Sequence, residues 1–187
     1  MTTPKFTVYN AVTHGTPYQA EALRMLASLA KFGIPYVAET YERGDSWVEN
    51  CASKARLIRR ARERIEGPIV WLDADAEVVK YPSLFDELAD TDADIGVHQR
   101  GEKGCISCTI WFPDTDRALD LIDRWQEACD ARPDIWDQKH LNPLRDEFRF
   151  ADLGREYAAL KGFDPWTSAT VIKQHQASRR FKKGMKK

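Results

Sequence analysis

Short runs of β-forming residues alternate with amphipathic segments along most of the chain. The pattern predicts strands at residues 5–12, 34–41, 69–72, 94–98, 108–112 and 148–153. It predicts helices at residues 17–32, 47–65, 82–89 and 114–131. Alternation of strands and helices is typical of an α/β fold, in which helices cover a sheet.

The predicted strand 69–72 ends in two acids that are separated by one residue, Asp73 and Asp75. In an open α/β sheet the carboxyl ends of the strands form the ligand crevice, so both carboxylates should lie beside a ligand. Hard oxygen ligands suit Mg²⁺ or Mn²⁺, which often binds substrate phosphates as well. The alternative is an ordinary turn after a core strand, where Asp is common for backbone reasons.

Size and charge indicate one domain followed by a short basic tail. The 187 residues are 43% hydrophobic and 30% charged, enough for one core. The net charge of −1 favours neither nucleic acid nor membrane, but residues 179–187 concentrate positive charge. We therefore expect a domain over residues 1–178 and a basic tail over 179–187. With no apolar segment of signal or membrane-spanning length, we expect a soluble, cytoplasmic protein with no membrane partner.

The four cysteines fit a reducing compartment better than a disulfide framework. Cys105 and Cys108 have the spacing of a zinc knuckle, but no second pair of this kind accompanies them. We interpret them as small buried side chains in and beside a strand.

Several polar residues stand where a ligand could meet them. The first strand ends in a glycine-containing turn at residues 13–17, but neither GxGxxG nor GxxxxGK[ST] occurs. Lys54 lies on the apolar side of its predicted helix, where a buried ammonium needs a partner and could reach a nucleotide. Asp137 and Gln138 stand at a helix start, where an N-cap is the alternative role for Asp137. His175 follows a short β-like run, and an isolated histidine is more often a surface or core residue.

Five segments together resemble the GT-A fold of nucleotide-diphospho-sugar glycosyltransferases. They are Asn50-Cys51-Ala52-Ser53-Lys54, residues 69–76, residues 94–100, Trp136-Asp137-Gln138 and His175. The resemblance spans roughly residues 5–176 and is closest to short members of the class, including ones found in bacteriophage. It implies a single-domain GT-A fold with a mixed, mainly parallel sheet flanked by helices.

The resemblance also implies a metal site and a metal-dependent reaction. Asp73 resembles the acid that meets the ribose or the metal, and Asp75 the acid that binds the divalent ion. His175 resembles the late histidine that completes the metal shell, and an imidazole suits Mn²⁺ better than Mg²⁺.

The remaining roles follow from the same resemblance. Lys54 looks like the basic residue that contacts the nucleotide, and the base-binding edge looks like Asn10, Val12 and Thr13. Asp137 and Gln138 resemble the pair beside the sugar and the acceptor. Many relatives carry a Gly and a Lys after the histidine that hold the diphosphate, so here Arg179, Arg180 or Lys182 would have to substitute.

The sequence therefore predicts an enzyme that moves a sugar from a nucleotide-diphosphate donor, expected to be UDP, to a hydroxyl group. In an inverting reaction Asp137 would take the proton of the acceptor, whereas in a retaining one Asp137 or Gln138 would face the sugar. The basic tail and the brevity of the chain suggest a hydroxymethylated pyrimidine in phage DNA as acceptor, in the host cytoplasm. A glycan or protein acceptor stays open, and nothing in the sequence sets the oligomeric state.

Two other functions fit the pattern less well. A sugar nucleotidyltransferase usually needs a Gly-rich loop with a basic residue after the first strand, and residues 10–17 contain one Gly and no Lys or Arg. A noncatalytic DNA-binding protein with an α/β core would bind DNA without turning over a nucleotide sugar.

Overall fold

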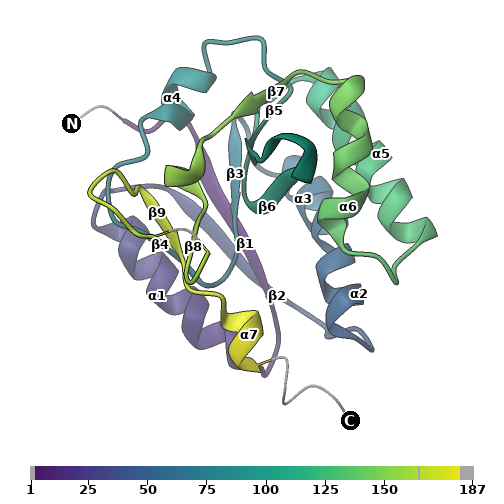
Figure 1. Ribbon diagram of the computed structural model, residues 1–187, viewed down its shortest axis with the longest axis horizontal. Helices are drawn as coiled ribbons and strands as arrows, with labels where there is room; N and C mark the ends of the chain where they lie inside the picture. The colour runs from purple at the N-terminus through teal and green to yellow at the C-terminus, as the bar shows by residue number, and fades with distance from the viewer. Residues whose placement is uncertain (1–2, 164, 182–187) are drawn as a thin grey trace.

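A six-stranded sheet in the order β2-β1-β3-β6-β5-β7 forms the centre of the computed structural model (Figure 1). The structure describes residues 3–163 and 165–181. β6 runs antiparallel to β3 and β5, and the other neighbouring pairs are parallel, which confirms the mixed, mainly parallel sheet. The strands are β1 (Thr7–Thr13), β2 (Tyr36–Tyr41), β3 (Ile69–Leu72), β5 (Ile95–Gln99), β6 (Cys105–Phe112) and β7 (Phe150–Asp152).

Helices cover both faces of the sheet, with α1 on one face and α3 and α5 on the other (Figure 1). The α-helices are α1 (Tyr18–Ala30), α2 (Trp47–Ala52), α3 (Lys54–Arg62), α4 (Leu84–Leu88), α5 (Asp116–Ala131), α6 (Asp137–Leu141) and α7 (Ala177–Phe181). Three 3₁₀ turns complete the helical elements: η1 (Gly101–Lys103), η2 (Asn142–Asp146) and η3 (Arg155–Tyr157).

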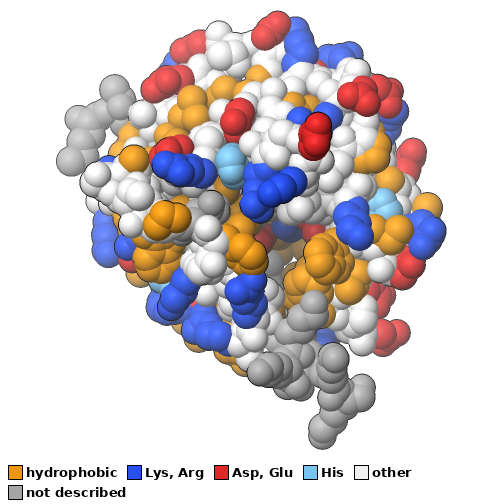
Figure 2. All heavy atoms as spheres, viewed as in Figure 1, with side chains coloured by type: hydrophobic (Ala, Val, Ile, Leu, Met, Phe, Trp, Pro, Cys, Tyr) orange, Lys and Arg blue, Asp and Glu red, His pale blue; other side chains and the backbone are white. Residues whose placement is uncertain are grey.

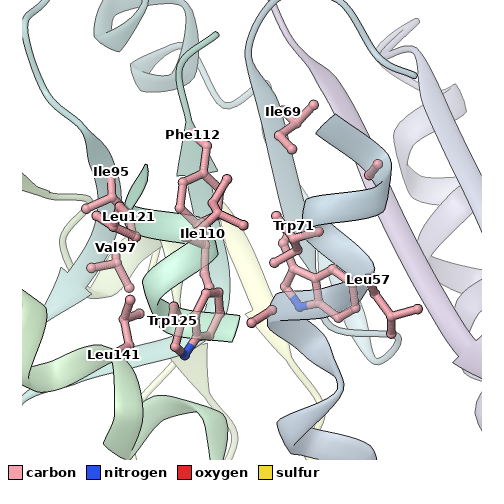
Figure 3. Packing of buried hydrophobic residues seen from close by; sticks show 14 of the residues in the cluster. Leu57, Ile69, Trp71, Ile95, Val97, Ile110, Phe112, Leu121, Trp125 and Leu141 are labelled. Carbon is pink, nitrogen blue, oxygen red and sulfur yellow. The ribbon is translucent and has the colours of Figure 1, made fainter. Parts of the chain in front are cut away.

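The alternation of side chains along β3 builds a separate core on each face. Ile69 and Trp71 belong to the core that α3 and α5 cover, whereas Val70 and Leu72 belong to the core that α1 covers. All four residues are buried, as expected for a strand with helices on both sides. Figure 3 shows the first of these cores, in which Trp125 of α5 lies close to strand and helix side chains.

A small second sheet returns the C-terminal part of the chain to the end of β3. It consists of β4 (Ala76–Val78), β9 (Ile172–Gln174) and β8 (Ala159–Leu160), in the order β4-β9-β8. β4 and β9 are antiparallel, and Ala76 is paired with Gln174. This register brings His175 next to Asp75 although the two are far apart in the sequence.

The predicted strands and helices are present, with three differences. The helix predicted over residues 47–65 is divided at Ser53 into α2 and α3, and the Ser53 hydroxyl donates to the Glu49 carbonyl at 3.1 Å. Bonds of this kind bend helices. β6 begins at Cys105, three residues before its predicted start, and β4 and β8 are too short for their period to be read from sequence.

The predicted boundary between domain and tail falls within α7, which runs from Ala177 to Phe181. Residues 182–187, the rest of the predicted basic tail, lie outside the described residues. In the described part of the chain, no helix combines the length and the apolar character needed to cross a membrane.

Leu121 tests the core between the sheet and α5. Its side chain is fully buried, so Leu121→Ala should lower the free energy of unfolding by about 2–5 kcal/mol through lost burial and a cavity. Leu23 in α1 is 68% exposed, and Leu23→Ala should change this free energy by about 0.5 kcal/mol or less. Urea unfolding followed by circular dichroism measures both variants, and equal losses would contradict the assigned core.

Candidate functional site

A cleft opens at the edge of the sheet where the parallel strands β1, β2 and β3 end. Thr13, Tyr41 and Asp73, which stand at these three strand ends, all line it. This is the edge at which open α/β sheets bind ligands. A hollow near the middle of the molecule in Figure 2 is bordered by hydrophobic side chains towards α2 and α6 and by Lys and Arg on the opposite side.

Asp73 is held at the base of the cleft by two donors. Its Oδ1 accepts a hydrogen bond from Trp71 Nε1 at 2.7 Å and lies 3.0 Å from Lys54 Nζ. Trp71 and Asp73 are two residues apart, and both are directed towards α3, the helix that begins with Lys54. Loss of solvation raises the pKa of Asp73, the Lys54 ammonium opposes this rise, and the nearby Asp75 adds to it.

Lys54 is a buried cation shared by two carboxylates. Its side chain is 9% exposed, and Nζ lies 3.0 Å from Asp73 Oδ1 and 3.1 Å from Asp137 Oδ2. Nζ also donates to the Ser107 carbonyl at 2.8 Å. Burial alone would lower the pKa of Lys54, but Asp137 and then Asp73 reverse the effect and raise it above its ordinary value. Two carboxylates and one carbonyl therefore surround Lys54 Nζ, so the partner that a buried ammonium needs is supplied by the protein itself.

Asp137 and Gln138 meet this group from the side of α6. The Ser107 hydroxyl donates to Asp137 Oδ2 at 2.7 Å, and the Ser107 backbone N–H donates to Gln138 Oε1 at 3.4 Å. Trp125 Nε1 donates to the Asp137 carbonyl at 2.8 Å and fixes the start of α6. Asp137 is only 4% exposed and is not among the residues that line the cleft. Its carboxylate is linked to the cleft by its contact with Lys54.

Asp75 joins the cleft to the C-terminal segment. Its carboxylate accepts a hydrogen bond from the backbone N–H of Ala177, and its backbone carbonyl accepts from the N–H of His175 at 3.1 Å. The imidazole of His175 has a different partner, because its Nε2 lies 2.9 Å from Glu77 Oε2. The ring centroid of His175 also lies 5.0 Å from that of Trp166.

The predicted metal ligands are therefore only partly brought together. Within residues 3–163 and 165–181, no group of three His, Cys, Asp or Glu side chains is close enough to hold a metal ion. Asp73 and Asp75 nevertheless both line the cleft. Since Mg²⁺ usually takes one or two protein carboxylates and completes its shell with phosphate oxygens and water, these two residues fit a divalent ion. The role of His175 as a third ligand stays a prediction.

The residues predicted to bind the nucleotide lie in different settings. Val12 and Thr13 line the cleft at the end of β1. Asn10 is buried behind them and donates from Nδ2 to the Leu72 carbonyl at 2.7 Å, which ties β1 to β3. The guanidinium of Arg179 lies 4.3 Å from the ring centroid of Phe163, while that of Arg180 lies 2.9 Å from Glu21.

Lys182, the third proposed substitute for a diphosphate-binding cation, lies outside the described residues. Arg179 and Arg180 both contact side chains of the domain, and among the described residues neither forms an ion pair with Asp73 or Asp75.

The sequence reasoning missed several residues of the site. Ser107 links Lys54 with the start of α6. Its signal in the sequence was a hydroxyl side chain, one of two with Thr109, in the otherwise apolar run of β6, since a buried polar group needs a partner. The cleft also includes residues from α2 and from the C-terminal segment: Trp47, Asn50, Cys51, Gln176 and Ser178. Asn50 and Cys51 belong to a segment that carries the resemblance, but no role was predicted for them. No local pattern marks Trp47, Gln176 and Ser178, because their place depends on how distant segments pack.

The sequence matches no family model and no curated protein. Similar solved structures include a glycosyltransferase involved in glycosylation of the major capsid of the virus PBCV-1, with a TM-score of 0.70 and 13% identity over 97% of this chain and 98% of that one. The glycosyltransferase GlyE of Streptococcus pneumoniae has a TM-score of 0.67 at 12% identity, over 91% of this chain and 55% of GlyE. Mouse xyloside xylosyltransferase 1 has a TM-score of 0.57 at 11% identity, over 92% of this chain and 98% of that one.

These likenesses confirm the predicted fold. The chain has the GT-A fold of these glycosyltransferases, and over nearly its whole length it matches a viral protein of similar size. At such low identity the likeness concerns the fold, and the activity has to be argued from the residues of the cleft.

Lys54→Met tests the buried charge group. The change removes the cation and leaves two carboxylates without it, so the free energy of unfolding at pH 7 should fall by about 3–5 kcal/mol. The pKa of folded Asp73 should rise further above its unfolded value. The folded state then binds more protons than the unfolded state, so stability should decrease as the pH rises through the folded pKa. Urea unfolding at pH 5 and pH 8 should show the larger loss at pH 8.

Lys5→Met is the matched control for this variant. Lys5 also pairs with a carboxylate, that of Asp90, but the two side chains are 51% and 72% exposed. The control should cost about 1 kcal/mol or less and show little added pH dependence. A Lys54→Met variant as stable as the wild type at pH 7 would exclude the proposed charge balance.

Proposed function

We propose that the protein is a glycosyltransferase that takes a sugar from a nucleotide-diphosphate donor and transfers it to a hydroxyl group. The observation that carries the proposal is the position of Asp73, Asp75 and Lys54 at one strand-end cleft, on a fold shared with known glycosyltransferases. Two carboxylates suit a divalent cation with a diphosphate, and the carboxyl edge of the sheet suits a nucleotide.

In this proposal each residue of the cleft has a distinct task. Asp75, together with Asp73, would hold Mn²⁺ or Mg²⁺, and Val12 and Thr13 would border the nucleotide. The chemistry that such an ion supplies when bound is neutralisation of the charge that develops on the diphosphate leaving group. Lys54 and Trp71 orient Asp73 by bonding to the same oxygen, Oδ1. UDP is the donor nucleotide implied by the resemblance and the first to be tested.

We further propose that Asp137 is a positioning residue. A general base must come within hydrogen-bond reach of the hydroxyl that it deprotonates. Asp137 is buried, accepts from Ser107 and faces Lys54, so its charge holds the ammonium under Asp73. Gln138, which is half-buried beside Ser107, stays a candidate for contact with the sugar.

The acceptor carries a hydroxyl, and DNA with a hydroxymethylated pyrimidine is one hypothesis for it. That hypothesis rests on the brevity of the chain and on the basic tail, of which residues 182–187 lie outside the described part. Of the described arginines, Arg179 contacts Phe163 and Arg180 contacts Glu21. The described arginines therefore give this hypothesis no support.

Donor binding is tested by thermal unfolding with UDP. At about 100 times Kd, UDP with Mn²⁺ should raise Tm by roughly 5–10 °C, and UDP with EDTA should give little shift. Asp75→Asn should abolish the Mn²⁺-dependent shift, because it replaces the negative carboxylate beside the cation with a neutral amide. The amide oxygen can still accept the hydrogen bond from the Ala177 N–H. The exposed Asp90→Asn is the matched control and should keep the full shift. An equal shift in EDTA would overturn the proposal of a metal-dependent donor site.

The role of Asp137 is tested by hydrolysis of the UDP-sugar, with water as acceptor. Asp137→Asn should lower kcat because Lys54 loses a partner, but the acidic limb of the pH profile should remain. Loss of that limb together with a decrease of about 10²–10⁴-fold would instead identify Asp137 as the general base. Asp134→Asn is the control, since Asp134 lies in the loop that precedes α6, is 65% exposed and pairs with Arg132.

A further inference from the structure

One exposed aromatic side chain stands beside the cleft. The large hydrophobic side chains that are exposed in the described part of the chain are those of Leu23, Tyr36, Trp136 and Phe163. Phe163 contacts the guanidinium of Arg179, and Leu23 and Tyr36 are not among the residues of the cleft. Trp136 is 44% exposed and differs from these three in its contact with the cleft wall.

Trp136 is joined to the cleft by two routes. Its ring lies edge to face with that of Trp47, with centroids 5.8 Å apart and an angle of 84° between the planes. Trp47 lines the cleft together with Asp73 and Asp75. In the chain, Trp136 directly precedes Asp137, whose carboxylate contacts Lys54. The exposed indole is therefore at the border of the site on the side of α2 and α6, where Figure 2 shows hydrophobic side chains beside the hollow.

The indole is held in place and has a cation beside it. Trp136 is the N-cap residue of α6, in an extended conformation with φ −65° and ψ 141°. Its carbonyl accepts from the backbone N–H of Lys139 at 2.9 Å, so the first turn of α6 fixes its backbone. Lys139 Nζ lies over the Trp136 ring, 5.6 Å from its centroid, so a group that stacks on this face of the indole would meet the ammonium.

We propose that Trp136 is the platform for the acceptor and that it stacks on the pyranose ring of a carbohydrate. One face of a pyranose presents C–H bonds, which pack against the electron-rich face of an indole. Its hydroxyl groups project from the edge, where the Lys139 ammonium can donate to one of them. This proposal rests on the proposed glycosyltransferase function and names the class of acceptor.

Size and charge favour a carbohydrate over other partners. A stable protein interface buries about 800 Å² on each partner, far more than one partly exposed indole supplies. Single-stranded nucleic acid needs a positive groove along its backbone in addition to stacking. Residues 132–139 contain Arg132, Asp134, Asp137 and Lys139, which sum to no net charge, and Arg132 is bound in a bidentate pair by Asp134. A neutral ring fits this surface better than a polyanion.

Binding of simple glycosides tests the proposal without knowledge of the natural acceptor. The probes are methyl β-glucoside, methyl β-galactoside and methyl α-mannoside, measured by saturation-transfer NMR with and without UDP and Mn²⁺. At least one should bind the wild type, with the strongest transfer to the C–H protons of one ring face. Trp136→Ala should weaken this binding by about ten-fold or more, and Trp136→Phe, which keeps a ring, should weaken it less.

Tyr36→Ala is the matched control, because Tyr36 is 46% exposed and lies outside the cleft. It should leave glycoside binding unchanged. If no glycoside bound the wild type, or if Trp136→Ala bound as well as the control, the platform would be refuted. Binding of a 5-hydroxymethylcytosine oligonucleotide that depends on Trp136, in the absence of glycoside binding, would also refute it and favour DNA.

The melting shift with UDP and Mn²⁺, measured on the same samples, separates the two proposals. A shift that Trp136→Ala retains, together with lost glycoside binding, supports both the donor site and the platform. A wild-type shift without glycoside binding refutes the platform alone. Absence of the shift in the wild type would refute the donor site instead, and the glycoside data would still decide whether Trp136 binds sugar.

Discussion

The buried ammonium of Lys54 is the contact on which the cleft depends. A buried ammonium is expensive unless anions and hydrogen-bond acceptors surround it, and here Asp73, Asp137 and the Ser107 carbonyl do so. These partners belong to the end of β3, the start of α6 and the first half of β6, while Lys54 itself begins α3. One charge thus fixes four elements relative to one another, and three of them, α3, β3 and β6, also contribute residues that line the cleft.

The fold explains why those elements meet at the carboxyl edge. The strands β1, β2 and β3 are parallel, so the residues that follow them all lie at the same edge of the sheet. β6 is antiparallel and begins at the same edge, which brings Ser107 beside Asp73. The short pairing of β4 with β9 then returns the C-terminal segment to Asp75. Strand direction therefore accounts for most of the site before any side chain is considered.

The difference between features set by local sequence and contacts between distant segments also explains what the sequence could predict. A run of β-forming residues marked β1, apolar runs marked β3 and most of β6, and the two acids after β3 marked the predicted functional edge. The break at Ser53 could not be predicted, because it accompanies a single hydrogen bond from the Ser53 side chain. The strands β4 and β8 could not be predicted either, because two or three residues are too few to show a periodic pattern. Ser107 and Trp47 were not predicted as site residues for a related reason, because each makes its contacts in the site with residues distant in sequence.

Asp73 and Asp75 share a motif but differ in what they are bound to, and the difference bears on their roles. Asp73 Oδ1 is paired with the Lys54 ammonium and accepts a hydrogen bond from Trp71 Nε1, so buried residues set the orientation of this carboxylate. Asp75 receives the N–H of Ala177 on its carboxylate and that of His175 on its carbonyl, so its surroundings are set by the C-terminal segment. Gln176 of this segment has a positive φ of 54°, a conformation that a non-glycine residue seldom adopts, and it lines the cleft. A ligand that draws on the Asp75 carboxylate competes with the N–H of Ala177. The core therefore orients the Asp73 carboxylate and the C-terminal segment holds that of Asp75, so a cation bound between the two, as proposed, would depend on both parts of the chain.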